Sequence, residues 1–200
     1  MKQTALLLAL LAGALLAAQA NAQGAYAGAG VLQASTNNAE DFAAFVIGPG
    51  GSADGSANGF KVYAGYQWPA RFGIEAGYYD LGTYDVTSFG VKTDEFATTA
   101  FAISGTYAMP IGTSVDISFK LGIAFTNADY TCVSACSFPF ISSCRSSTAG
   151  LFGAGVGWRL ARHFGLRADF EYFTGIEHSA AGRIGIYDYA TWSLSGEVRF

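Results

Sequence analysis

The stretch VDISFKLGIAF, residues 115 to 125, alternates apolar and polar side chains without a break. Val115 and Phe125 belong to one face, while Asp116 and Lys120 belong to the other. A period of two residues is that of a β-strand with two unlike faces. This segment is therefore predicted to be a strand that separates an apolar environment from a polar one.

The same alternation recurs along the rest of the chain. It is found in residues 60–68, 72–81, 96–108, 151–160, 165–172 and 191–200. Residues 25–34 are also strand-like, although both of their faces are small and apolar. Together with 115–125, these segments predict an all-β protein of eight strands.

The charges in these strands all lie on one kind of face. The apolar faces carry none, and the opposite faces carry Lys61, Lys120, Arg159, Arg167 and Arg199 against Glu75, Asp116, Asp169, Glu171 and Glu197. A soluble sandwich would leave such a face in water. A membrane barrel turns it into the lumen instead, where balanced charges and small residues suit a closed, low-dielectric space. We therefore expect these ten residues to form a lumen charge network.

The composition favours the membrane barrel. Charged residues make up 13% of the chain, against a usual value of about 25%. After residue 22 no run of 18 consecutive apolar residues occurs that would predict a membrane helix. Aromatic residues such as Trp68, Tyr107 and Trp158 gather at strand ends, as in an interfacial girdle.

The links between the strands alternate in length. Short links are expected at 68–72, 109–114 and 160–164, and long ones at roughly 35–58, 82–95, 127–147 and 174–188. This pattern predicts an eight-stranded antiparallel up-and-down transmembrane β-barrel. Its N- and C-termini would be periplasmic, and its four long links would be extracellular loops.

The N-terminus predicts export. Residues 1–22 have one cation, Lys2, then an apolar run and small residues at the spacing of a cleavage site, the layout of a cleaved signal peptide. Cleavage is expected after Ala22, with Ala20 as the alternative. Residues 23–200 would then be the barrel domain, and the predicted location is the outer membrane of a Gram-negative bacterium.

Three stretches carry a resemblance to a known family. KVYAGYQWPARFGIEAGYYDLG (61–82), GLRADFEYF (165–173) and SLSGEVRF (193–200) resemble a strand hairpin, the seventh strand and the closing strand of OmpA-like eight-stranded outer-membrane barrels. The resemblance covers essentially the whole mature chain. It implies a short, barrel-only member without the periplasmic peptidoglycan-binding domain.

The resemblance also implies roles for individual residues. Glu75 and Arg167 match two members of that family's lumen salt-bridge network, whereas Ser104 and Gly157 stand where the family has a lysine and a glutamate. Lys61 and Lys120 are the candidates to compensate from other strands. The terminal Phe200, with apolar residues at alternate positions before it, resembles the signal read by the barrel-assembly machinery.

The cysteines are confined to TCVSACSFPFISSC, residues 131 to 144. Their spacing, without a nearby histidine, fits no common zinc pattern, and an exported loop favours disulfides over thiolate ligands. We expect a disulfide between Cys132 and Cys144, with Cys136–Cys144 as the alternative. Either choice leaves one cysteine without a partner of its own.

No motif predicts catalysis or a cofactor. The adjacent His178 and Ser179 evoke outer-membrane barrels that deacylate lipid A, but neighbours on a strand point to opposite faces, so a base and nucleophile would be separated. The glycine-rich stretch 150–157 has strand periodicity, and no helix follows it as a nucleotide loop requires. Asp80, Asp85, Asp94 and Glu95 are interpreted as a solvated rim rather than a cation site.

We therefore expect a non-enzymatic barrel that supports the envelope and presents loops for adhesion or host interaction. The alternative is a narrow, low-conductance pore for ions or small solutes, and a lipid-modifying enzyme is a third reading. The expected partners are outer-membrane lipid and lipopolysaccharide, the barrel-assembly machinery, and host surface or matrix proteins. A net charge of −4 without basic patterning excludes nucleic acid, and a monomer is expected.

Overall fold

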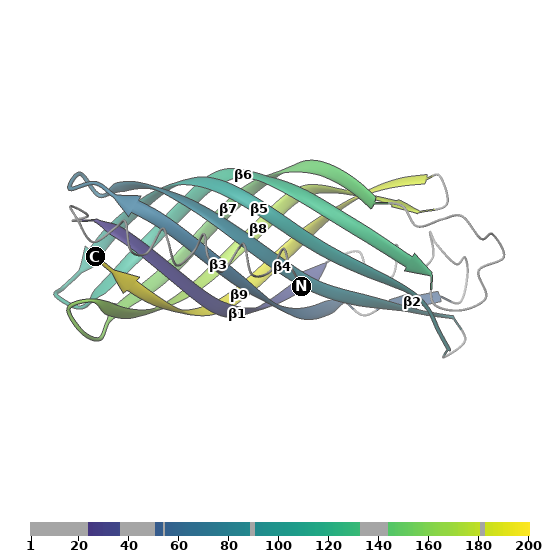
Figure 1. Cartoon of the computed structure of the whole chain (residues 1–200), viewed down its shortest axis with the longest axis horizontal. Helices are drawn as coiled ribbons and strands as arrows, with labels where there is room; N and C mark the ends of the chain where they lie inside the picture. Colours follow the sequence, from purple (N-terminus) through teal and green to yellow (C-terminus); the bar gives the residue numbers. More distant parts are fainter. Residues whose placement is uncertain (1–23, 37–50, 54, 89–90, 133–143, 181–182) are drawn as a thin grey trace, which may run out of the picture.

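The computed structural model describes residues 24–36, 51–53, 55–88, 91–132, 144–180 and 183–200. Within these ranges no helix is both long and apolar enough to cross a membrane. The strands form one antiparallel sheet and lie tilted to the long axis of the molecule (Figure 1). The predicted signal peptide, residues 1–22, falls outside the described residues.

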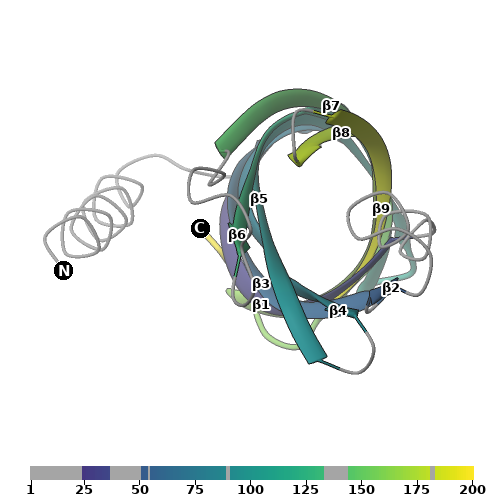
Figure 2. The same ribbon diagram turned by 90° about the vertical axis from the view of Figure 1, so that its right-hand side faces the viewer.

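The sheet closes on itself. Its strands are β1 (Ala25–Thr36), β2 (Gly51–Ala53), β3 (Ser56–Gln67), β4 (Phe72–Ser88), β5 (Val91–Ile111), β6 (Val115–Cys132), β7 (Cys144–Arg159), β8 (Phe164–Ala180) and β9 (Arg183–Arg199). β1 pairs with both β3 and β9, and β4 pairs with β5, so eight strands complete a ring, seen end-on in Figure 2. The short β2 adds to β4 beyond this ring. The predicted eight-stranded antiparallel barrel is thus confirmed.

The two ends of the barrel differ. Short turns connect β3 to β4, β5 to β6 and β7 to β8 at one end, where the C-terminus also lies (Figure 1, left). We call this the turn end and the opposite one the loop end. The sequence predicts that the turn end faces the periplasm.

The strands continue much further toward the loop end than expected. Residues 82–95 and 174–188 were expected to be loops, yet β4 and β5 include all of the first segment except 89–90, and β8 and β9 include all of the second except 181–182. His178 and Ser179, expected in a loop, accordingly lie in β8. The four long links are therefore shorter than predicted.

Two β-bulges explain why the pattern failed here. The register shifts by one residue between Asp80 and Thr83, and again between Phe173 and Ile176. A further shift between Val86 and Thr87 lies in the pairing of β4 with β5. Gly82 lies within the first bulge and has a φ of 86°, and Gly175 has a φ of 85° in the second. An extra residue reverses which positions face inward, so a strand that crosses a bulge no longer shows one continuous period.

The two faces of the sheet are inverted relative to a soluble protein. On β6 the apolar Phe119 and Leu121 are 49% and 64% exposed, while the intervening Lys120 is 4% exposed. At the turn end, aromatic side chains pair on the outer surface. The rings of Tyr66 and Trp68 are 5.4 Å apart, and those of Phe72 and Tyr107 are 5.0 Å apart. An apolar belt with aromatic rings at its edge is the surface that a bilayer requires.

Candidate functional site

The lumen contains a buried ion-pair network drawn from opposite sides of the barrel. Lys61 Nζ of β3 lies 2.5 Å from Asp169 Oδ2 and 3.1 Å from Glu171 Oε2 on β8. Lys120 Nζ of β6 lies 2.6 Å from Glu171 Oε1 and 2.7 Å from Glu75 Oε1. Each lysine therefore connects strands across the barrel. Lys61 is held by two carboxylates and Lys120 by three, since its Nζ also lies 3.8 Å from Asp169 Oδ2.

Arg167 completes this network. Its Nη1 lies 2.8 Å from Glu75 Oε2 and 3.5 Å from Glu197 Oε2, and its Nε lies 2.9 Å from Asp169 Oδ1. Three cations thus face four carboxylates. Because ions buried without partners are costly, this mutual pairing is what makes the charged lumen compatible with a stable barrel.

Tyrosine hydroxyls add a further hydrogen bond to three of these carboxylates. The hydroxyl of Tyr26 donates to Glu75 at 3.0 Å, that of Tyr79 to Glu171 at 2.9 Å, and that of Tyr63 to Glu197 at 3.3 Å. The ring of Tyr63 also lies 5.3 Å from Lys61 Nζ, 5.7 Å from Lys120 Nζ and 5.3 Å from Arg167 Cζ. Sequence reasoning missed these tyrosines, although the place of Tyr63 and Tyr79 on the charged faces of β3 and β4 was a usable signal.

The glycine-rich stretch of β7 provides room for the network. The register pairs Gly153 with Glu171 and Gly155 with Asp169, and Gly157 lies opposite Asp116 of β6. A Cβ on Gly157 would lie 2.5 Å from Asp116 Oδ1, and one on Gly155 would overlap Asp169 Oδ1. Glycine is therefore needed here for space.

The last three predicted lumen charges lie nearer the turn end. Arg199 is half-buried; its Nε lies 2.6 Å from Glu197 Oε1 and its Nη2 lies 3.5 Å from Asp116 Oδ2. Arg159, by contrast, is exposed, and the structure does not bring it into the network. It lies at the end of β7, at the mouth of the barrel.

A second, apolar layer fills the lumen on the loop side of the network. Leu81, Leu151, Phe173 and Ile176 are completely buried there. Tyrosine rings extend this layer, with Tyr84 and Tyr189 5.6 Å apart. Sequence analysis predicted a polar lumen throughout and missed this layer. Leu81, Leu151 and Phe173 keep the inward-facing period of their strands, so alternation was a usable signal for them. The bulges hid only the residues beyond them, such as Tyr84 and Ile176.

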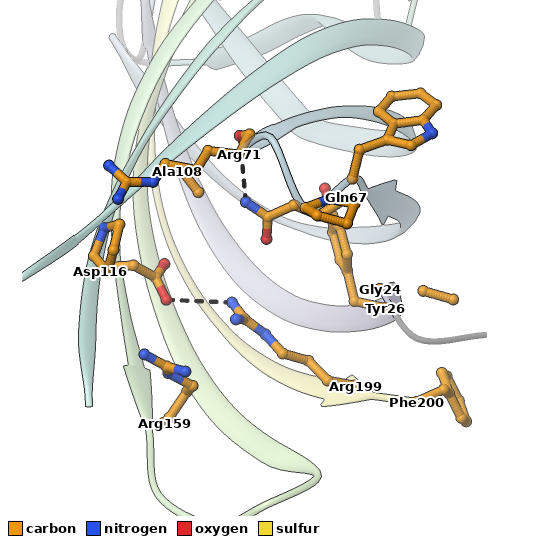
Figure 3. Close-up of a pocket in the computed structure, with 13 residues that line it drawn as sticks. Gly24, Tyr26, Gln67, Arg71, Ala108, Asp116, Arg159, Arg199 and Phe200 are labelled. Carbon is orange, nitrogen blue, oxygen red and sulfur yellow. Dashed lines mark hydrogen bonds and ion pairs between the residues drawn. The ribbon is translucent and has the colours of Figure 1, made fainter. Parts of the chain in front are cut away.

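The turn end opens into a pocket of about 420 Å³ (Figure 3). Arg71, Arg159 and Arg199 line it together with Asp116, and Trp68, Pro69, Pro110 and Phe200 contribute apolar surface. The backbone N–H of Phe200 donates to the carbonyl of Ala25 at 2.9 Å, which ties the end of the chain to β1.

The structure describes only some of the other sequence-based candidates. Cys136 and the side chains of Cys132 and Cys144 fall outside what the structure describes, as do those of His178 and Ser179. The disulfide therefore stays a prediction. Asp80 Oδ1 accepts a hydrogen bond from the N–H of Gly82 at 2.9 Å. Within the described residues no group of three or more histidine, cysteine or acidic side chains could hold a metal ion.

A closed eight-stranded barrel with an apolar exterior and an ion-paired lumen defines the class of small transmembrane β-barrels. A family model, the OmpA-like transmembrane domain, matches residues 20–198. The chain belongs to this family. A comparison with curated protein sequences gives no match.

Solved structures of outer-membrane proteins share the fold. Neisserial surface protein A, from Neisseria, aligns with 90% of this chain and 99% of its own, at 17% identity and a TM-score of 0.61. Ail of Yersinia pestis, solved with the heparin analogue sucrose octasulfate, aligns with 88% of this chain and 99% of its own, at 18% identity and a TM-score of 0.56. OprG of Pseudomonas aeruginosa aligns with 88% of this chain and 96% of its own, at 15% identity and a TM-score of 0.61. These similarities show that the fold is shared.

Proposed function

We propose that this protein is a non-enzymatic outer-membrane barrel that supports the envelope and presents its loop end for adhesion or host contact. The observation that carries the proposal is the filled lumen. One layer is closed by ion pairs among Lys61, Lys120, Arg167 and four carboxylates, and the next is closed by apolar side chains. Such a lumen supports a scaffold whose specific contacts are made at its ends.

A narrow pore for ions or small solutes is the alternative. The polar turn-side half of the lumen and the pocket at its mouth favour it. The apolar layer on the loop side disfavours it, because an ion passing Leu81, Leu151 and Phe173 would lose its hydration without gaining partners. We therefore place the pore second.

The inference that the protein is not an enzyme rests on its relatives and on its sequence. The similar structures carry the names of surface, attachment and outer-membrane proteins, none of which denotes an enzyme. We infer that the chain is exported by a cleaved signal peptide, is inserted by the barrel-assembly machinery and contacts lipid and lipopolysaccharide as a monomer.

The charge of the loop end points to the chemistry of its partner. Nine acidic and three basic residues lie in the four long links that the sequence predicts, 35–58, 82–95, 127–147 and 174–188. This excess of negative charge favours basic host proteins and disfavours sulfated polysaccharides. In that respect we expect this protein to differ from Ail, whose structure was solved with a heparin analogue.

Attachment of bacteria with and without the protein would test the proposal. Cells would be applied to surfaces coated with a panel of basic and acidic matrix proteins, and with heparin. We expect the protein to increase attachment to the basic proteins, with the increase reduced by salt because exposed charges are screened. Heparin should capture both strains equally.

Two outcomes would count against the proposal. Equal attachment of both strains to every surface would remove the adhesive role. A protein-dependent gain on heparin would show that loop charge does not select the partner. A strain whose barrel carries shortened loops serves as the matched control, since it retains the lumen and the membrane-facing surface.

A further inference from the structure

The pocket at the turn end has a composition that the proposed function does not explain. Arg71, Arg159 and Arg199 line it from three separate parts of the barrel, and Asp116 is the one acidic side chain among its lining residues. Figure 3 shows the three arginine side chains extending into the pocket, with Asp116 bonded to Arg199. Cationic side chains therefore dominate a cavity that is open at the mouth.

The two outermost arginines are carried on fixed backbone. Arg71 has a φ of 71°, its N–H donates to the carbonyl of Trp68 at 3.0 Å, and its carbonyl accepts from Ala108 N–H at 2.9 Å. Arg159 ends β7, and its N–H donates to the carbonyl of Ser114 at 2.7 Å. Each side chain thus starts from a position that neighbouring strands hold in place.

Two of the three arginines of the pocket have no ion-pair partner among the described residues. Arg199 is paired with Glu197 and Asp116. Arg71 and Arg159 make no ion pair with any described residue, although the lumen above them pairs each of its cations at least twice. Two guanidinium groups around one cavity without a carboxylate of their own favour the binding of an anion.

The surroundings favour a phosphate group as that anion. A guanidinium donates two parallel hydrogen bonds to phosphate oxygens, a geometry that suits this group well. One wall of the pocket is apolar, formed by Trp68, Pro69 and Phe200, and Trp68 packs against Tyr66 in the aromatic girdle. Because such aromatic rings lie at the level of lipid headgroups, the pocket opens at the depth where lipid phosphates are found.

We propose that the turn-end pocket binds a phosphate group, supplied by the headgroup of an anionic phospholipid of the adjoining leaflet. Arg71 and Arg159 hold its oxygens, Arg199 adds positive charge from the floor, and the Trp68 wall contacts the apolar part of the lipid. The pocket thereby fixes the turn end of the barrel to the membrane interface.

The test compares the barrel with three variants in nanodiscs of phosphatidylcholine, with and without phosphatidylglycerol. The variants are Arg71→Gln, Arg71→Gln with Arg159→Gln, and Arg162→Gln. Arg162 is the matched control, since it is exposed in the β7–β8 turn but does not line the pocket. Native mass spectrometry measures the phosphatidylglycerol retained on release from the disc, and calorimetry measures the affinity for inorganic phosphate.

We expect the double variant to retain about tenfold less phosphatidylglycerol than the wild type, since it loses charge-assisted hydrogen bonds. Arg71→Gln should lie between the two, and Arg162→Gln should match the wild type.

Loss of phosphate affinity with unchanged lipid retention would keep the phosphate site but assign it to a soluble phosphate compound. Equal retention and equal phosphate affinity in all four proteins, or an equal loss in Arg162→Gln, would overturn the proposal. Heat-dependent gel migration verifies that each variant is folded.

Discussion

At the scale of single residues, Arg167 connects more of the lumen than any other cation in the described structure. It reaches Glu75 on β4, Asp169 on its own strand and Glu197 on β9. It also donates to Ser118 Oγ of β6 at 3.4 Å, so its polar contacts reach three other strands. Its guanidinium also lies over the ring of Tyr63. Removing it would leave several carboxylates with fewer partners in a space that excludes most water.

We expect Arg167→Ala to lower the free energy of unfolding by about 3–5 kcal/mol, the usual cost of leaving buried charge uncompensated. Urea unfolding of the purified barrel in lipid vesicles measures the change. The membrane location and the fold should persist, since the apolar exterior is untouched.

The control for this prediction is Arg162→Ala, because Arg162 is exposed in a turn. Its unfolding curve should overlay that of the wild type. Equal stability of the wild type and Arg167→Ala would contradict the view that the network stabilises the barrel.

At the scale of elements, β7 shows how a strand is shaped by its neighbours. Its inward glycines lie beside acidic side chains that other cations already hold in place. A Cβ on Gly155 would overlap Asp169 Oδ1 and lie 3.0 Å from both the carbonyl oxygen of Ala168 and Ser118 Oγ. Asp169 cannot easily move, because Lys61 and Arg167 both bind it.

We therefore predict that Gly155→Ala destabilises the barrel by about 1–3 kcal/mol through overpacking. Gly105→Ala is the matched control, since its Cβ would lie on the exposed face of β5, 3.8 Å from its nearest neighbour. The same urea titration distinguishes them. A Gly155→Ala barrel as stable as Gly105→Ala would show that the lumen has spare room.

The hairpin of β6 and β7 carries the predicted disulfide. β6 ends at Cys132, β7 begins at Cys144, and the register pairs Cys144 with Asp129, three residues before Cys132. We predict one reactive thiol in the unreduced protein and none after Cys136→Ser. A Cys132–Cys144 bridge would raise the free energy of unfolding by about 3 kcal/mol, because it restricts the unfolded chain.

Alkylation before and after reduction, followed by peptide mapping, counts and locates the thiols. A reactive Cys132 would favour the Cys136–Cys144 alternative. Three reactive thiols before reduction would show that no bridge forms.

At the scale of the whole molecule, the lumen is divided into a charged layer and an apolar layer. Because the apolar layer closes the loop side, we expect the purified barrel to show no discrete channel openings in planar bilayers. The inserted protein is shown to be folded if it resists unfolding in detergent until the sample is boiled.

Reproducible openings that change when Lys61 or Lys120 is replaced would instead favour the pore. The replacement Gly105→Ala is the control, since it lies on the lipid-facing surface. Openings that are insensitive to the lumen charges would indicate leakage around the protein.

The sequence by itself determined the class of fold and the inversion of its faces. Alternation along residues such as 115–125 requires two unlike environments, and balanced charges on the glycine-rich face place that face inside. Alternation is local, since it depends on residues within one strand, and the charge balance is a sum over strands that does not depend on how they are arranged. For the same reason nine of the ten predicted lumen charges lie in the network or beside it, while Arg159, at a strand end, lies at the mouth.

The partners of those charges were decided by the tertiary structure. Lys61 and Glu171 are 110 residues apart in the chain, and only the register that closes the barrel brings them together. The same holds for part of the apolar layer, because the bulges at Gly82 and Gly175 turn Tyr84 and Ile176 inward. Closure also placed Arg71 and Arg159 around one pocket, although Arg71 lies in the β3–β4 turn and Arg159 ends β7. Contacts across a lumen depend on how the strands are staggered, and no single strand contains that information.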